Sequence, residues 1–106
     1  MEIKENEFIR TKTGKIDKVI NNNYYMSQYI ECEKRIVEKE YIVKHSFNII
    51  DLIEVGDHIN GNRVYKITSA CIYCVGKAVQ NKLSINIKSI LTHEQYERNC
   101  YRLEDN

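Results

Sequence analysis

Apolar and polar positions alternate with a period of two along most of this chain, a pattern that is typical of β-strands. Residues 7–11 and 15–20 form two such runs, and Gly14 lies between them, where glycine readily takes the positive φ of a tight turn. The pattern therefore predicts an N-terminal hairpin. The asparagines at 21–23 predict a turn after it, because asparagine tolerates left-handed backbone conformations.

The segment from residue 24 to residue 44 brings β-branched, aromatic and charged residues together. Residues 29–33, 35–37 and 41–45 are predicted to be strands. Alternating Glu and Lys over residues 31–40 would also support a short exposed helix, through ion pairs four residues apart. We favour the strands and keep the helix as the alternative.

The strongest local signal is Asn60-Gly61, which lies between alternating runs at residues 55–59 and 62–67. Both central residues of a type I′ turn need positive φ, so this dipeptide predicts a hairpin. The second strand of the hairpin is predicted to continue through residues 69–75. A polar loop over 76–82 and a further alternating strand over residues 83–88 are predicted to follow.

Two short helical segments are predicted from their capping residues. Ser46 is predicted to N-cap a single turn over residues 48–53. Thr92 and Gln95 have the spacing of a capping box and predict a helix of two turns that ends at Asn99. Residues 100–103 are predicted to return as a final strand.

These elements predict a mainly β protein: a small SH3-like or half-open barrel of about six to seven short strands with one short C-terminal helix. Residues 1–106 contain no linker and no internal repeat, so we expect a single compact β-rich domain. The size fits, because 106 residues is close to the most common domain length.

Composition narrows the function classes. With 42% hydrophobic and 29% charged residues the chain is ordinary globular material, which excludes wholesale disorder. The net charge of +1 gives no overall field that would attract nucleic acid or an anionic membrane. The chain has no long apolar run and no secretory leader, so we expect a soluble, cytoplasmic protein that does not contact the membrane.

The four cysteines raise the question of a metal. Cys71 and Cys74 have the C-x-x-C spacing of zinc proteins, and Cys32 and Cys100 would have to complete a tetrahedral site. In a strand, however, residues three apart point to opposite faces and cannot share an ion. We therefore favour free thiols, keep zinc at Cys71 and Cys74 as a weak alternative, and expect no cofactor.

Catalytic arrangements find little support in the sequence. The histidines His45, His58 and His93 are scattered, and no nucleophile elbow or oxyanion loop accompanies them. The four glycines are well separated, so they cannot form a glycine-rich phosphate loop. We expect a protein that is not an enzyme.

The charge distribution points to binding. No acidic residue lies between Asp57 and Glu94, and that stretch is basic. If the strands that carry its basic residues are neighbours of the N-terminal hairpin, one face is positive and has tyrosines beside it. The predicted binding face consists of Arg63, Lys66, Lys88, Tyr65, Tyr73, Arg10 and Lys12. The alternative is a solvated face that serves solubility.

Residues 8–14, 45–57, 60–61 and 90–96 together resemble small proteins carried by phages and prophages of low-GC Gram-positive bacteria, Clostridia especially. That group has no assigned catalytic or binding residues, so the resemblance carries over no site. It implies a context in which small proteins bind and inhibit a component of the host cell, as anti-CRISPR proteins do.

The expected function is therefore that of a non-enzymatic, anti-CRISPR-like inhibitor of a host defence protein or ribonucleoprotein. The alternative is a sponge or binding module that captures a phosphate-bearing signal nucleotide or a nucleic acid, with an oligomer as its expected form.

Overall fold

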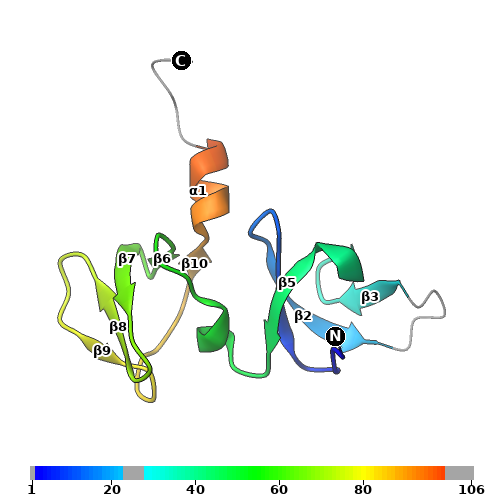
Figure 1. The fold of residues 1–106 in the computed structure, drawn as a ribbon, viewed down its shortest axis with the longest axis horizontal. Coiled ribbons are helices and arrows are strands. Elements are labelled where there is room, and N and C mark those ends of the chain that lie inside the picture. Colours follow the sequence, from blue (N-terminus) through cyan, green and yellow to red (C-terminus); the bar gives the residue numbers. More distant parts are fainter. Residues whose placement is uncertain (1, 23–27, 100–106) are drawn as a thin grey trace. The chain divides into compact units, whose positions relative to one another are not determined.

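The computed structural model describes residues 2–22 and 28–99. Contacts divide the chain into a first unit, Met1–Ile53, and a second unit, Glu54–Asn106. Each unit contains one antiparallel sheet of five strands (Figure 1). The predicted mainly β class and the short C-terminal helix are confirmed, whereas the predicted six to seven strands are too few, because ten are present in the described residues. The single domain expected over 1–106 stays a prediction.

The sheet of the first unit has the order β4-β3-β2-β1-β5. Its strands are β1 (Phe8–Thr11), β2 (Ile16–Asn21), β3 (Tyr29–Cys32), β4 (Ile36–Glu38) and β5 (Ile42–Ser46). The N-terminal hairpin is confirmed: β1 pairs with β2, and Gly14 has a φ of 84° in the turn between them. Strands also prevail over the alternative helix within residues 31–40, apart from the single 3-10 turn η1 (Lys39–Tyr41).

The core of the first unit is formed by apolar side chains that alternate along these strands, in the way that the period of two predicts. Six of them are buried in one cluster together with Ile3, which precedes β1: Ile9, Val19, Ile30, Cys32, Val37 and Ile42. A second 3-10 turn, η2 (Ile49–Leu52), follows β5 and buries Leu52.

The sheet of the second unit has the order β10-β6-β7-β8-β9. Its strands are β6 (His58–Ile59), β7 (Asn62–Ile67), β8 (Cys71–Cys74), β9 (Gln80–Asn81) and β10 (Ile90–Leu91), and α1 (His93–Asn99) follows β10. The Asn60-Gly61 hairpin is confirmed, because both residues have positive φ, 51° and 86°, and β6 pairs with β7 across them.

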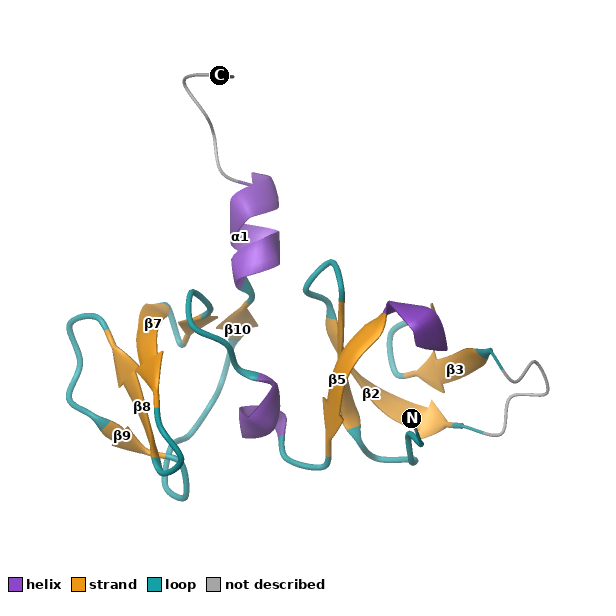
Figure 2. Ribbon diagram, viewed as in Figure 1, coloured by secondary structure: helices purple, strands orange, loops and turns teal. Residues whose placement is uncertain are grey.

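Two predicted strands of the second unit are wrong. The strand expected to run on through residues 69–75 turns back instead: Thr68 and Cys71 exchange hydrogen bonds in the turn, and β8 pairs with β7. Residues 83–88 form no strand (Figure 2). The side chain of Asn60 accepts hydrogen bonds from the amides of Lys88 and Ser89 and donates one to the carbonyl of Asn86, so this backbone is bonded to the hairpin tip.

The predicted caps have mixed outcomes. The capping box is confirmed: Thr92 Oγ1 accepts from the amide of Gln95, and Gln95 Oε1 accepts from the amide of Thr92, each at 3.4 Å. The cap of η2 is Asn48 rather than Ser46, because the Asn48 side chain accepts from the amide of Ile50. The strand predicted at 100–103 lies outside the described residues. Within the described part of the chain, every helix is too short to cross a membrane.

The two sheets share one connectivity. In each unit four consecutive strands form a meander, and the fifth strand returns to pair with the first, as β5 does with β1 and β10 does with β6. In both units the first strand therefore has a neighbour on each side, while the fourth and fifth strands form the edges of the sheet.

Candidate functional site: the face of β7 and β8

A β-bulge at the centre of the second unit brings three predicted site residues together. Val64 pairs with Cys74, but Lys66 pairs with Tyr73, so both Tyr65 and Lys66 lie opposite Tyr73. Strict alternation would turn Lys66 to the side of buried Val64. The extra residue instead leaves Tyr65 and Lys66 both exposed on the outer side.

Two ring contacts join the members of this group. The rings of Tyr65 and Tyr73 lie 6.1 Å apart at 54°, within the range of a tilted aromatic pair. The Lys66 Nζ lies 5.1 Å from the centre of the Tyr73 ring, a cation–π contact. Tyr65 is 50% exposed, so much of its ring is available to a partner.

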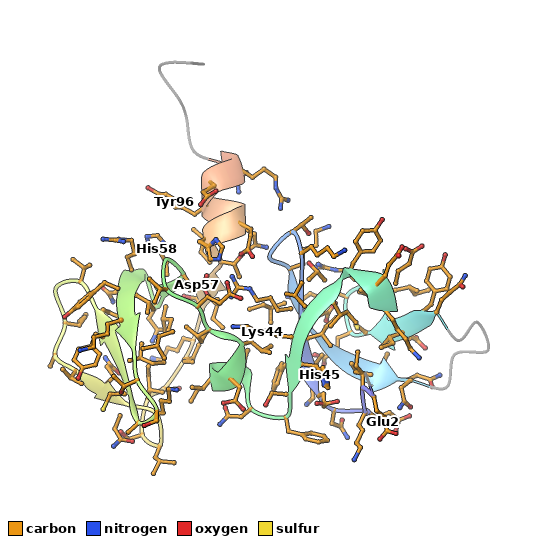
Figure 3. All side chains as sticks on the ribbon, in the orientation of Figure 1. Glu2, Lys44, His45, Asp57, His58 and Tyr96 are labelled. Carbon is orange, nitrogen blue, oxygen red and sulfur yellow. The ribbon has the colours of Figure 1, made fainter. Side chains whose placement is uncertain are left out.

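The same face extends over β6 to the C-terminal helix. Arg63 lies two residues before Tyr65 and pairs with His58 across the hairpin, which places these side chains on one side. The ring of His58 stacks on that of Tyr96 from α1, with centres 4.9 Å apart (Figure 3). We call this surface the basic–tyrosine face and define it as Arg63, Tyr65, Lys66 and Tyr73 with the adjoining His58 and Tyr96.

The remaining predicted site residues lie elsewhere. Lys88 belongs to the second unit, on the segment bonded to Asn60, and is exposed. Lys12 belongs to the first unit, where its Nζ lies 5.5 Å from the centre of the Tyr41 ring. The prediction that Arg10 lies on an exposed face is wrong. It is fully buried in β1, a strand with a neighbour on each side, and its Nη1 donates to the carbonyl of Leu52 at 2.9 Å.

The three cysteines that the structure describes are buried or half-buried free thiols. Cys71 is half-buried and Cys74 buried, with side chains on opposite faces of β8 as their odd spacing requires. Cys32 lies in the core of the first unit, where burial, with Asp17 adding to it, raises the pKa of its thiol to about 11. Burial also raises the pKa of Cys74. These two thiols stay protonated at neutral pH, which makes them poor ligands and poor nucleophiles. Cys100 lies outside the described residues.

A second group of polar side chains, which the sequence reading missed, converges in the second unit. The Nε2 of His93 lies 2.8 Å from the Oε1 of Glu54 and 3.6 Å from the Oε1 of Glu94. Each of the three residues offers one ligand atom, and these atoms lie within 4.8 Å of one another. Within residues 2–22 and 28–99, this is the one group of three side chains arranged so that it could hold a metal ion.

Asp57 supports this group from beneath. It is fully buried, its Oδ2 accepts from the amide of Glu54 at 2.8 Å, and its Oδ1 accepts from the amide of His93 at 2.9 Å. Gly56 lies against the same histidine: a Cβ there would be 3.2 Å from the Cβ of His93, and the glycine φ is 99°. The Gly56-Asp57 pair therefore fixes the backbones that carry two of the three groups.

The sequence predicts one of these two arrangements better than the other. The partnership of His58 with Arg63 follows from the register of the Asn-Gly hairpin, so it was within reach of the sequence. The contact between His93 and Glu54 joins residues 39 positions apart, and no local sequence pattern predicts it.

Comparison with protein-family models, curated proteins and solved structures finds no match for this chain.

Proposed function

We propose that this protein is a non-enzymatic binding protein whose basic–tyrosine face docks on a host defence protein or ribonucleoprotein and inhibits it. The observation that carries the proposal is the bulge, which holds Tyr65 and Lys66 together against Tyr73 on the exposed side of the sheet. The resemblance to phage-borne proteins supplies the context of host inhibition, in the cytoplasm of the host cell.

The chemistry of the face suits a preorganised contact. Tyrosine and arginine are enriched among the residues that dominate binding energy at interfaces, and tyrosine loses little conformational entropy on binding. The ring contacts already hold Tyr65, Tyr73 and Lys66 in one arrangement. A partner therefore meets side chains that already contact one another, and such preorganisation lowers the entropic cost of association.

The charge of the face restricts the partner. No acidic residue occurs from His58 to His93, so the basic side chains of the β7 strand have no acidic neighbour in that stretch of sequence. A positive surface cannot imitate a phosphate backbone. Inhibition through this face therefore means covering an acidic protein surface, since opposite potentials attract across an interface.

A second candidate is direct capture of a single-stranded nucleic acid or a phosphate-bearing nucleotide. It is favoured by the half-exposed rings of Tyr65 and Tyr96, at 50% and 47%, which are available for bases to stack on. Arg63, Lys66 and Lys88 would then contact phosphate groups. An oligomeric sponge belongs to this second candidate.

The finer architecture expected from the sequence, an SH3-like or half-open barrel, belongs to the same proposal. The return of each fifth strand to the first, with η1 directly before β5, supports it. Small barrels of this kind present functional residues on an outer sheet surface, which is the position of the basic–tyrosine face.

The test is capture of a partner from a lysate of a low-GC Gram-positive bacterium, with and without nuclease. We expect one protein in near-equal amount that survives nuclease treatment and is lost when Arg63, Lys66 and Lys88 are all replaced by Glu. The matched control replaces Lys15, Lys34 and Lys77, three other exposed lysines, by Glu and should keep the partner.

The outcomes separate the two candidates. A partner lost on nuclease treatment, together with salt-sensitive binding of a fluorescent oligonucleotide, favours nucleic-acid capture. Equal capture by the charge-reversed protein and by its control contradicts the proposed face in either form.

A further inference from the structure

We propose that Glu54, His93 and Glu94 form a binding site for a divalent transition-metal ion, with Zn²⁺ or Co²⁺ as its chemical type. The site is separate from the basic–tyrosine face and is independent of the proposed function. Two observations support it: the geometry of the donor atoms and the hydrogen bonds that hold the ligand backbones in place.

The donor atoms have the spacing of metal ligands. Bonds of about 2.0–2.2 Å from zinc to histidine nitrogen and carboxylate oxygen place the donors of a tetrahedral ion about 3.4 Å apart. The Nε2 of His93 lies 2.8 Å from one carboxylate oxygen and 3.6 Å from the other, on either side of that value. One nitrogen and two oxygens form a donor set that borderline ions such as Zn²⁺ and Co²⁺ accept.

The carboxylates of Glu54 and Glu94 both approach the Nε2 of His93, but this nitrogen carries at most one proton. Its N–H can be directed at the Glu54 oxygen 2.8 Å away, while the Glu94 oxygen stays at 3.6 Å. A divalent ion in place of that proton would bind the nitrogen and both carboxylate oxygens at once.

The ligands are also held in advance. The buried carboxylate of Asp57 accepts hydrogen bonds from the backbone amides of Glu54 and His93, and these two residues come from different segments of the second unit. Groups that position metal ligands in this way commonly contribute to affinity. The three side chains are 27%, 31% and 23% exposed in the order Glu54, His93, Glu94, so an ion and its waters can enter from solvent.

The described thiols compete poorly for the same ion. Cys71 and Cys74 lie on opposite faces of β8, and Cys32 is buried in the first unit. None of these three is a member of the converging group. Co²⁺ is a suitable probe, because its absorption spectrum distinguishes nitrogen and oxygen ligands from thiolates.

The experiment is a titration of the full chain with Co²⁺, followed by absorption spectroscopy and calorimetry. We expect one ion per chain and visible bands without a thiolate charge-transfer band. His93→Gln and Glu54→Gln should each weaken binding at least about tenfold. Loss of a residue that only positions a metal ligand already weakens binding about 10–100-fold, and each of these changes removes a ligand itself. Glu40→Gln, an exposed change in the first unit, should bind Co²⁺ as the unaltered protein does.

Three results would overturn the site: no binding at millimolar Co²⁺, a thiolate band that Cys71→Ser abolishes, or equal affinity in His93→Gln and the unaltered protein. Circular dichroism without metal shows whether each variant is folded. If His93→Gln is not folded, Glu94→Gln, which changes a half-buried residue in the first turn of α1, replaces it. Unchanged affinity in that variant would equally overturn the site.

Discussion

The two units of the chain share one strand connectivity but use it differently. The first unit fills its sheet with a cluster of seven buried apolar residues, and its strands have three to six residues. In the second unit three of the five strands have only two residues, and its described residues contribute four buried apolar side chains, Ile59, Val64, Ile72 and Cys74. The same strand connectivity is therefore compatible with a large apolar core, as in the first unit, and with short strands that carry an exposed basic and aromatic surface, as in the second.

The charged side chains also differ between the two units. In the first unit buried carboxylates organise turns: Asp17 accepts from the amides of Lys18 and Lys34. Glu7 accepts from the amide of Lys4 and contacts His45. Among the described residues of the second unit, Asp57 is the one buried carboxylate, while the cations of β7 are exposed.

The largest effect on stability is expected from a substitution in the core of the first unit. Ile30 is fully buried in β3, so Ile30→Ala should lower the free energy of unfolding by about 2–5 kcal/mol, through lost burial and a new cavity. Denaturant unfolding measures this. Leu83→Ala, at a side chain that is 97% exposed, is the control and should change it by less than about 0.5 kcal/mol. Equal effects at both sites would contradict the assignment of the core.

In the second unit the largest effect is expected at Asp57. Asp57→Ala leaves the amides of Glu54 and His93 without their buried acceptor, and each such bond to a charged group contributes about 1.5–3 kcal/mol. We expect faster hydrogen exchange in α1 and a lower melting temperature. Asp51→Ala, at an exposed carboxylate of η2, is the matched control. A variant as stable as the control would show that Asp57 does not hold the helix.

A smaller effect is expected at the tip of the hairpin. Asn60→Gly keeps a residue that accepts positive φ but removes the side-chain bonds to the segment at residues 86–89, at a cost of about 1 kcal/mol. Denaturant unfolding gives the energy, and amide chemical shifts show whether the segment is released. Asn86→Ala leaves the accepting carbonyl in place and should change neither. Unchanged shifts in Asn60→Gly would mean that other contacts hold the segment.

The smallest effect is a pH dependence in the first unit. Burial alone would raise the pKa of Glu7, but the amide of Lys4 and the side chain of His45 outweigh it and hold the pKa below its ordinary 4.5. Glu7 therefore stabilises the folded state above about pH 4.5, and this stability is lost as the pH falls through its lower folded pKa.

The measurement is the unfolding free energy of the unaltered protein and of Glu7→Gln from pH 7 to pH 3. The gap between them should be constant near neutrality and close in acid. Glu5→Gln, on the exposed surface, is the control. A gap that widens in acid would reverse the sign of the effect.

Local signals in the sequence predicted local structure well. The Asn60-Gly61 turn and the capping box of Thr92 and Gln95 depend on residue types at fixed offsets, and both are present. The alternation of apolar residues likewise placed most strands of the first unit.

What the sequence did not predict depends on distant partners. The alternating run at 83–88 predicts a strand. Instead, the Asn60 side chain accepts hydrogen bonds from the backbone amides of Lys88 and Ser89. Arg10 has the composition of a surface residue, but its side chain is fully buried and donates to the carbonyl of Leu52, 42 residues further along the chain. The bulge at Tyr65 carries no local signal, because it arises when Val64 and Ile67 pair with Cys74 and Ile72 in a shifted register.

The return of each fifth strand to the first has a kinetic consequence. Within each meander every pairing joins neighbours along the chain, so the hairpins can form early and close only short loops. The pairs Arg10–Lys44 and Ile59–Ile90 instead close loops that contain most of their unit. We therefore expect formation of these two contacts to be the slow event in folding, one for each unit, because loop closure costs entropy before the long-range contacts form.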